Sequence, residues 1–361
     1  MTNTKRISLL GIFFIMLLAL GITNHVIMIP ILLQTAGRDA WFGVLMSMVL
    51  HIAWVYIIYF IMKQTNQQPI FPWFKERFGS VLTWIFIIVT TVYFFLMALV
   101  MLRETTTWVR VSYLPQTPTS VVSIVIILLC IYVANKGIRS IAIISGILIP
   151  FVWILGHFVA VVNLQHKDYS LLTPLFVDGY KPMLKSMAIG LGGFMEIIIL
   201  IFIQQHMSRK ISYLSIVILS VLLGGLTIGP LMGAIANFGP TIASQSRYPA
   251  YEQWMLVTIT KYFTHVDFLA LYQWMSGALI RISLFLFIIS GSIPFKKPKR
   301  RLLFLLLLGA LLSGVSLIPS VDHELEMYVL GKYSSVSLIF LTTFTLVIAL
   351  STTIKVKTKG D

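Results

Sequence analysis

The fold is decided by residues 186–206, SMAIGLGGFMEIIILIFIQQH. This segment has the length of about 20 residues that a helix needs to cross the hydrocarbon core of a bilayer. Its one Asp, Glu, Lys or Arg residue is Glu196, and a glycine-rich stretch at residues 190–193 lies shortly before it. Lipid offers no hydrogen-bond partners to backbone groups that a break in the helix frees, or to a carboxylate. The segment therefore predicts a membrane helix that is interrupted near its middle and faces protein or a water-filled cavity.

A second stretch, residues 7–33, has the same character: ISLLGIFFIMLLALGITNHVIMIPILL. Here Gly21, Thr23, Asn24 and His25 lie near the middle of the apolar run, ahead of Pro30. Since a removed signal peptide has a shorter apolar region and a small-residue cleavage site, we expect this segment to remain as the first span. Its polar middle predicts a second interrupted helix.

The composition of the whole chain agrees with a membrane protein. The 361 residues are 58% hydrophobic and 11% charged, and their mean hydropathy is +0.93. Soluble domains carry about 25% charged residues, so a large soluble enzyme is excluded. The net charge of +15 is no sign of a nucleic-acid partner, because the charges form short clusters between long apolar runs, as in polytopic membrane proteins. The single cysteine, Cys130, excludes an intramolecular disulfide.

Reading for apolar runs of membrane length predicts an all-α polytopic membrane protein with about ten transmembrane helices. No connection is long enough for a soluble domain, so residues 1–361 are expected to form a single integral membrane domain. Two connections, residues 69–78 and about 237–266, mix aromatic, apolar and charged residues and are expected to lie in the membrane interface. The expected spans are 7–33, 40–62, 80–102, 119–134, 138–163, 186–206, 211–236, 267–293, 302–319 and 333–354.

The distribution of basic residues predicts the orientation. With the N-terminus placed in the cytoplasm, the inner segments hold most of the 27 Lys and Arg residues and only Glu76 and Asp361 of the acidic ones. The positive-inside rule therefore favours both termini on the cytoplasmic side. The inner basic residues are Lys5, Arg6, Lys63, Lys75, Arg77, Lys136, Arg139, Arg209, Lys210, Lys296, Lys297, Lys299, Arg300, Arg301, Lys355, Lys357 and Lys359.

The two interrupted spans are the first and sixth of ten, so each opens one half of the chain. With five spans in each half, the second half enters the membrane from the opposite side. This is the arrangement of inverted-repeat transporters, whose central site lies at paired discontinuous helices. We expect repeats over approximately 1–165 and 166–361. The alternative is that the glycines only permit close helix packing, and we keep that interpretation for Gly224, Gly225 and Gly229.

Two charged residues are expected near the middle of the membrane. Glu196 lies in span 6 and Arg281 in span 8, where Trp274, Gly277 and Arg281 share one helical face. Charged side chains at this depth pair with each other or serve a ligand or ion path. The sequence leaves three interpretations open for the two residues, namely a structural ion pair, contacts to a ligand, or a proton path.

Histidines and tyrosines in the spans give weaker signals. His51, His157 and His206 lie in different spans without metal-ligand spacing, so we expect no metal site. His25 differs because it lies in the first interruption, and Tyr93 of span 3 is a candidate ligand contact. No nucleophile, nucleotide-binding or metalloprotease motif is present. We therefore expect neither an enzyme nor a cofactor.

Several short motifs resemble the B subunits of spore germinant receptors. The stretch Ala36-Gly37-Arg38-Asp39-Ala40-Trp41 after span 1 is similar to their Ala-Gly-x-Asp-Ala-Trp region. Leu114-Pro115-Gln116-Thr117-Pro118 after span 3 resembles their Leu-Pro-x-Thr-Pro element. The pair Met195-Glu196, the stretch Leu172-Thr173-Pro174 and Trp274 followed by a basic residue fit the same pattern. The motifs occur in the family's order over nearly the whole chain.

The resemblance implies the five-plus-five inverted-repeat fold of the amino acid–polyamine–organocation superfamily, with broken helices 1 and 6. It implies a subunit that binds a small nutrient, an amino acid or a sugar, and acts with A-type and C-type subunits in the inner membrane of bacterial endospores. By position, it places Thr23 and Asn24 in the unwound part of span 1, and Gly192, Gly193 and Phe194 in that of span 6. It implies that Tyr93 and Arg281 face the same cavity. Relatives often have small residues where this chain has Thr23-Asn24-His25. The expected ligand-binding residues are Thr23, Asn24, His25, Tyr93, Gly192, Gly193, Phe194, Glu196, Trp274 and Arg281.

Two function classes therefore remain. The first is a nutrient-sensing receptor subunit without turnover, which the motifs favour. The second is a secondary amino acid permease, either proton-coupled through Glu196 or independent of coupling ions with Arg281 in place of a cation. The fold serves both classes and does not distinguish them.

Overall fold

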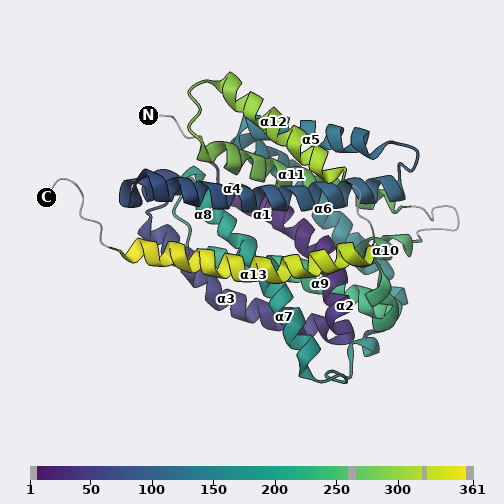
Figure 1. Cartoon of the computed structure of the whole chain (residues 1–361). Coiled ribbons are helices and arrows are strands. Elements are labelled where there is room, and N and C mark those ends of the chain that lie inside the picture. Colours follow the sequence, from purple (N-terminus) through teal and green to yellow (C-terminus); the bar gives the residue numbers. More distant parts are fainter. Residues whose placement is uncertain (1–5, 259–265, 319–322, 355–361) are drawn as a thin grey trace.

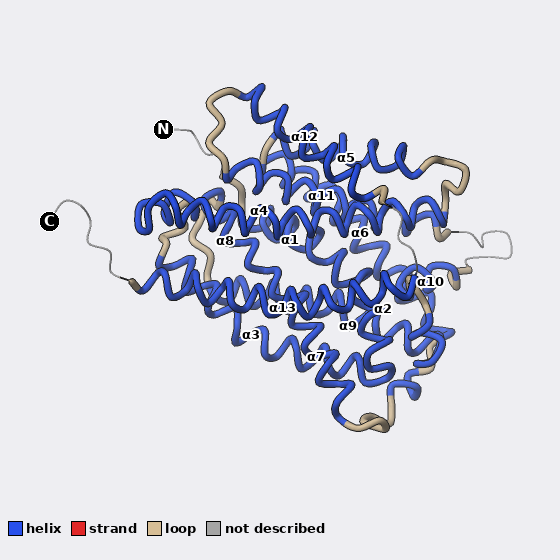
Figure 2. Tube along the Cα trace, viewed as in Figure 1, coloured by secondary structure: helices blue, strands red, loops and turns tan. Residues whose placement is uncertain are grey.

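A computed structural model describes residues 6–258, 266–318 and 323–354, and the side chains of residues 323–335 are not described. Several residues of the predicted charge asymmetry, among them Lys5, Lys355, Lys357, Lys359 and Asp361, lie outside the described residues. The described chain is helical apart from turns, short connections and one isolated parallel bridge between Ile7 and Met207 (Figure 2). The α-helices are α1 Leu9–Ile22, α2 Met28–Ala36, α3 Ala40–Gln64, α4 Ile70–Ser112, α5 Thr119–Lys136, α6 Ile138–Val162, α7 Tyr180–Phe194, α8 Ile199–Ile203, α9 Tyr213–Gln245, α10 Pro249–Met255, α11 Phe268–Ser292, α12 Pro298–Ser316 and α13 His323–Thr353.

Eight helical segments in the described part of the chain are long and apolar enough to cross a membrane. The first of them, Leu9–Gln64, holds two of the expected spans. The chain reverses direction at Gly37, whose φ of 48° suits glycine. Helix α3 then runs back past α2 (Figure 1). A further helix, α12, is a 19-residue helix whose first turn is basic. The prediction of a polytopic all-α membrane protein is confirmed, and each expected span corresponds to a helix or helix pair.

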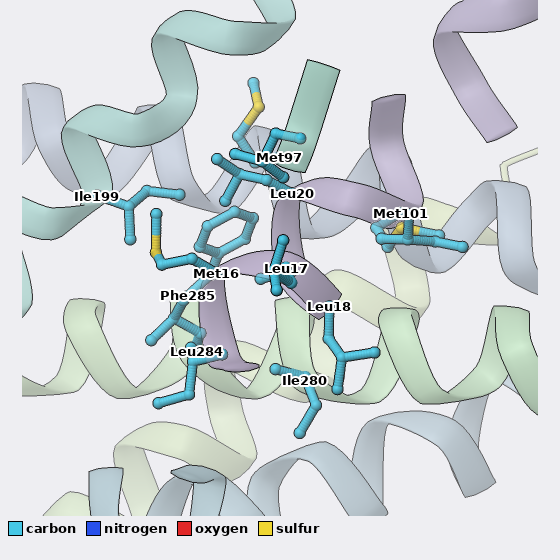
Figure 3. Packing of buried hydrophobic residues seen from close by; sticks show 14 of the residues in the cluster. Met16, Leu17, Leu18, Leu20, Met97, Met101, Ile199, Ile280, Leu284 and Phe285 are labelled. Carbon is cyan, nitrogen blue, oxygen red and sulfur yellow. The ribbon is translucent and has the colours of Figure 1, made fainter. Parts of the chain in front are cut away.

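Helix α1 lies at the centre of the bundle (Figure 1) and packs against α6, α9 and α11. Figure 3 shows Met16, Leu17, Leu18 and Leu20 of α1 among apolar side chains from α4, α8 and α11. These four side chains are at most 5% exposed. Helices within a membrane gain little from the hydrophobic effect, so this close packing is what holds α1 in place. Residues of α1 are therefore positioned against several helices at once.

Helix α4 is longer at both ends than the apolar run predicted. Helix α4 continues past the expected end of its span to Ser112, because the carboxylate of Glu104 is paired with Arg247 at 2.8 Å and so does not force the helix to end. At its other end, the interfacial stretch at residues 69–78 forms the first turns of α4, before a kink at Gly79 with φ 79°. The interfacial helix expected within residues 237–266 is α10, and residues 259–265 of that stretch lie outside the described residues.

Basic side chains expected on the inner side cap the C-terminal ends of two helices. Arg77 donates to the carbonyl oxygens of Thr352 and Ile354 at 3.5 and 3.4 Å, and Arg301 donates to that of Ala134 at 3.2 Å. The last carbonyls of a helix lack partners within the helix, and cations stabilise its negative end. These contacts gather segments from α4, α5, α12 and α13 at the end of the molecule that the sequence assigns to the cytoplasm.

Candidate functional site

Glu196 and Arg281 form a buried ion pair. The guanidinium donates from Nη1 to Oε2 at 2.6 Å and from Nη2 to Oε1 at 2.8 Å, and the two side chains are 3% and 2% exposed. The cation also lies over the ring of Phe285, with Cζ 4.8 Å from the ring centroid. Paired bonds of this kind fix the orientation of both groups. Of the interpretations that the sequence left open, the structure supports the direct ion pair in this conformation.

The same arginine also contacts the first interrupted span. Its Nη1 donates to the carbonyl oxygen of Ala19 at 2.9 Å. In an undistorted helix that oxygen accepts from the amide of Thr23, but the Thr23 amide donates to Leu20 instead. Arg281 therefore donates a hydrogen bond to a carbonyl oxygen that has lost its amide partner through the distortion of α1. One guanidinium thus links α11 to both interrupted spans.

The interruptions are local departures from α-helical hydrogen bonding, and neither is an extended break. In the first span, Thr23–Ile27 form the π-helix η1 between α1 and α2, so Thr23, Asn24 and His25 lie where the sequence placed the distortion. In the sixth span, the distortion is the 3₁₀-helix η5, Met195–Ile198, between α7 and α8. The prediction that Gly192, Gly193 and Phe194 form the unwound part is wrong, because all three belong to the regular helix α7. Glu196 is the predicted residue that lies within the distortion.

The glycines of span 6 serve close packing instead. A Cβ placed on Gly193 would overlap Met28 Sδ and lie 2.7 Å from Asn24 Oδ1, and one placed on Gly190 would lie 2.5 Å from Ser47 Oγ. Helix α7 can approach α3 and η1 so closely only because these glycines carry no side chain. The packing interpretation therefore applies to these glycines. Its consequence is that η1 lies directly against α7.

Buried polar groups without hydrogen-bond partners surround this contact. Within the described part of the chain, Thr23 Oγ1, both amide atoms of Asn24 and both ring nitrogens of His51 have no partner. These three side chains are at most 4% exposed, and the His51 ring lies 5.6 Å from that of Phe194. Each such group costs about 1–3 kcal/mol. We name Thr23, Asn24, His51, Gly193 and Phe194 the η1–α7 site. A small polar ligand is the kind of molecule that would satisfy its groups.

Tyr93 and Trp274 are not part of the η1–α7 site. The hydroxyl of Tyr93 lies 3.3 Å from Ser337 Oγ, and its ring stacks on Phe340, so this side chain contacts α13. Trp274 stacks on Trp108 with ring centroids 4.1 Å apart and donates from Nε1 to Thr105 Oγ1 at 3.1 Å. Neither Tyr93 nor Arg281 lines the large cavity described next, so the expectation that both face one ligand cavity stays a prediction. Their ligand-binding role stays a prediction.

A cavity of about 540 Å³ lies on the other side of η1, between α6, α9 and α11, with α10 at one end. We name it the α6–α9 groove. Its volume falls within the ~300–1,000 Å³ typical of small-molecule sites. His25 and Trp274 are the predicted site residues that line it. His25 also lies 3.1 Å, through Nδ1, from the carbonyl oxygen of Leu226 in α9. The two faces of η1 therefore border two different environments, the η1–α7 site and the groove.

The sequence motifs that carried the resemblance meet in space. Asp39 accepts the amide N–H of Phe176 on Oδ1 and Oδ2 at 3.1 and 3.2 Å. The neighbouring Trp41 donates from Nε1 to the carbonyl oxygen of Leu172 at 3.3 Å. The segment after span 1 therefore binds the segment before span 6, which joins the C-terminal end of span 1 to the N-terminal end of span 6.

Comparisons with known proteins identify the family. A family described as spore germination protein has a model that matches residues 6–324. The chain belongs to this family. Spore germination protein XB of Bacillus anthracis is 36% identical to this chain over 328 residues, 91% of the chain and 92% of the relative. Relatives from Bacillus subtilis (strain 168) include YfkT, 26% identical over 80% of this chain and 79% of its own, and spore germination protein KB, 21% identical over 87% and 86%. The chain is thus an integral membrane protein of the spore germination receptor family.

Sequence reasoning missed an aromatic cover where α4, α10 and α11 meet. Tyr113 donates to the backbone oxygen of Asp267 at 2.8 Å and Tyr251 to its Oδ2 at 3.0 Å. Burial raises the pKa of both phenols above the ordinary value, so both remain neutral donors. The ion pair between Glu104 and Arg247 joins α4 to the segment just before α10. Only the abundance of aromatic residues in 237–266 hinted at this cover.

Proposed function

We propose that this protein is the nutrient-sensing membrane subunit of a spore germination receptor, and that a small nutrient, an amino acid or a sugar, binds at the η1–α7 site. The observation that carries the proposal is the set of orphaned polar atoms on Thr23, Asn24 and His51 beside Gly193. Transporter folds with interrupted helices bind their substrates at such places. In this proposal the side chains of η1 and α3 supply the polar contacts, and Phe194 forms an apolar wall.

The ion pair between Glu196 and Arg281 provides the route by which ligand binding is transmitted to α11 in this proposal. Met28 and Asn24 are packed against Gly193 in the present conformation, so a nutrient must separate η1 from α7 to enter. Both elements are linked to Arg281, through Ala19 and Glu196. Ligand binding would therefore shift α11 relative to spans 1 and 6. A ligand changes a conformational equilibrium only when it binds the two conformations with different affinities. In this proposal the two conformations of the protein differ in the distance between η1 and α7.

We further propose the cellular arrangement that the family resemblance implies. The chain acts with A-type and C-type subunits in the inner membrane of the endospore, surrounded by lipid, with both termini in the cytoplasm. The two halves, about 1–165 and 166–361, form inverted repeats. In this account the protein is not an enzyme and requires no cofactor.

A secondary amino acid permease is the alternative, because the same fold serves transport. Reconstitution into proteoliposomes distinguishes the two. A sensor binds labelled amino acid or sugar without net accumulation inside the vesicles, whether or not a proton gradient is present. Saturable uptake that Glu196→Gln abolishes would support the permease and contradict the sensor.

The sensor is tested directly in spores with Gly193→Leu, since a side chain there overlaps Met28 and Asn24. We expect loss of the nutrient response with unchanged assembly with the partner subunits. Gly314→Leu is the matched control, because Gly314 is exposed on α12 and a Cβ there meets nothing within 4 Å. An unaltered nutrient response in Gly193→Leu spores would place the nutrient site elsewhere.

A further inference from the structure

The α6–α9 groove opens sideways, through the flank of the bundle. Trp153 of α6 and Val221 of α9 line it and are nevertheless 36% and 45% exposed. On α9, Gly225 and Gly229 continue the same exposed face at four-residue spacing, and a Cβ on either would meet nothing within 4 Å. The absence of side chains on these glycines leaves the space between the two helices open. Because both helices are apolar and of membrane length, the medium at this opening is lipid.

Hydrogen bonds hold α10 in place at one end of the groove. Gln253 of α10 donates to the carbonyl oxygen of Pro230 in α9 at 3.1 Å and accepts, on its backbone oxygen, from Asn163 at 2.6 Å. Trp254 donates to Gln273 at 3.0 Å, which in turn donates to the backbone oxygen of Val152 in α6 at 2.9 Å. Helix α10 is therefore fastened to the helices on both sides of the groove. Entry from the bilayer is easier than entry from the water phase.

The dimensions match one leaflet. The lining on α1 and η1 runs from Leu17 to Val26, which spans about 14 Å at the helical rise of ~1.5 Å per residue. The hydrocarbon core of a bilayer is about 30 Å thick, so the groove covers roughly half of it. Its lining is largely apolar and aromatic, with Trp153, Trp254 and Trp274 among its residues. An extended acyl chain fits this shape and chemistry better than a compact polar solute.

A cation lies where the headgroup of such a lipid would be. Lys167 follows α6 and lines the groove, and among the lining residues that the structure describes it is the one Lys, Arg, Asp or Glu. Its ammonium donates to the carbonyl oxygen of Ala160 at 2.9 Å, and an ammonium has three donors. Burial lowers the pKa of Lys167 below its ordinary value, and a neighbouring anion would offset that loss of solvation.

We propose that the α6–α9 groove holds one acyl chain of an anionic phospholipid from the surrounding membrane, with the lipid phosphate at Lys167. The bound chain contacts Gly21, Ile22 and His25, so it packs on the face of η1 opposite to the η1–α7 site. This site is separate from the proposed nutrient site and does not depend on it.

Photo-crosslinking tests the proposal on the full chain in nanodiscs. The probe is phosphatidylglycerol that carries a diazirine on one acyl chain, and the adducts are mapped by peptide mass spectrometry. We expect adducts concentrated on residues 153–160 and 221–229, well above those on the exposed face of α5 at Leu128 and Leu129. Even labelling of all lipid-facing helices would overturn the proposal.

Two variants sharpen the test. A Cβ on Gly225 meets nothing within 4 Å, and leucine has a higher helix propensity than glycine. Gly225→Leu should therefore place a side chain in the groove and lower groove adducts several-fold, and Gly229→Leu should do the same. Gly314→Leu, the matched control on α12, should leave them unchanged. Groove adducts that persist in both α9 variants would contradict the proposal.

The headgroup preference is measured with the same label on phosphatidylcholine. Lys167→Gln should lower the preference for phosphatidylglycerol about fivefold, the equivalent of about 1 kcal/mol for one basic residue facing anionic lipid. The exposed Lys181→Gln is the control. An unchanged preference in Lys167→Gln would refute the assignment of the headgroup to this lysine.

Discussion

Arg281 donates two hydrogen bonds to Glu196, at 2.6 and 2.8 Å, and both side chains are almost completely buried. The same arginine also donates to the carbonyl oxygen of Ala19, four residues before the π-helical turn of span 1. The two interrupted spans are therefore connected through a residue of a third helix. A movement of α1 or η5 relative to α11 must break hydrogen bonds of Arg281.

Removing one partner of this pair should be more harmful than removing both. Glu196→Gln and Arg281→Met each leave a buried charge without its partner, which costs about 3–5 kcal/mol in known cases. We expect low abundance and a lower unfolding temperature in detergent for each single variant. The double variant should recover part of the loss, with a coupling energy of about 0.5–3 kcal/mol.

The control for this cycle is Glu76→Gln, since Glu76 is exposed; it should unfold at the temperature of the unchanged protein. Strictly additive effects of the two substitutions would show that Glu196 and Arg281 do not interact. Arg281 would then be better explained as a cation for a ligand carboxylate.

Asp39 should be required for the link between the segment after span 1 and the segment before span 6. Asp39→Ala leaves the part-buried amide of Phe176 without its acceptor, and we expect a loss of about 1 kcal/mol in the free energy of unfolding. Asp39→Asn keeps one acceptor oxygen and should lose less. Thermal unfolding in detergent gives the comparison, with the exposed Asp178→Ala as control. Equal stability of all three variants would show that this contact does not stabilise the protein.

The membrane orientation predicts opposite labelling of two exposed positions. In a Cys130→Ser background, cysteine substituted for Asp178 should react with an impermeant maleimide from outside. Cysteine substituted for Lys299 should react only after the membrane is opened. The positive-inside rule assigns these residues to opposite faces, and both are exposed in the structure. Reaction of both from outside would contradict the orientation.

The sequence predicted the spans well because membrane helices are defined by length and hydropathy. Its failures arise where protein contacts replace lipid or water. The charges at Arg103 and Glu104 indicated the end of span 3, yet the paired Glu104 allows α4 to continue. The Gly190–Gly193 stretch indicated unwinding, but contacts with Ser47, Met28 and Asn24 explain these glycines within a regular helix.

The site was predicted in part. The location of Thr23 and Asn24 in a distorted turn followed from their polarity within an apolar run, whereas His51 joins them only through the packing of α3 on α7. The groove escaped prediction because Gly224 and Gly225 look alike in the sequence. A Cβ on Gly224 would overlap Met48, as the packing interpretation requires, while one on Gly225 would enter open space. Only the rotation of α9 about its axis distinguishes them.

Ligand-dependent thermal stabilisation of the purified protein, against a panel of amino acids and sugars, tests the central claim most directly. A ligand that binds only the folded state raises its apparent stability. We predict that at least one nutrient raises the unfolding temperature of the unchanged protein, that Asn24→Ala and Gly193→Leu each abolish this shift, and that Gly225→Leu keeps it. An undiminished shift in both the Asn24 and the Gly193 variants would contradict the claim that the nutrient binds where spans 1 and 6 are interrupted.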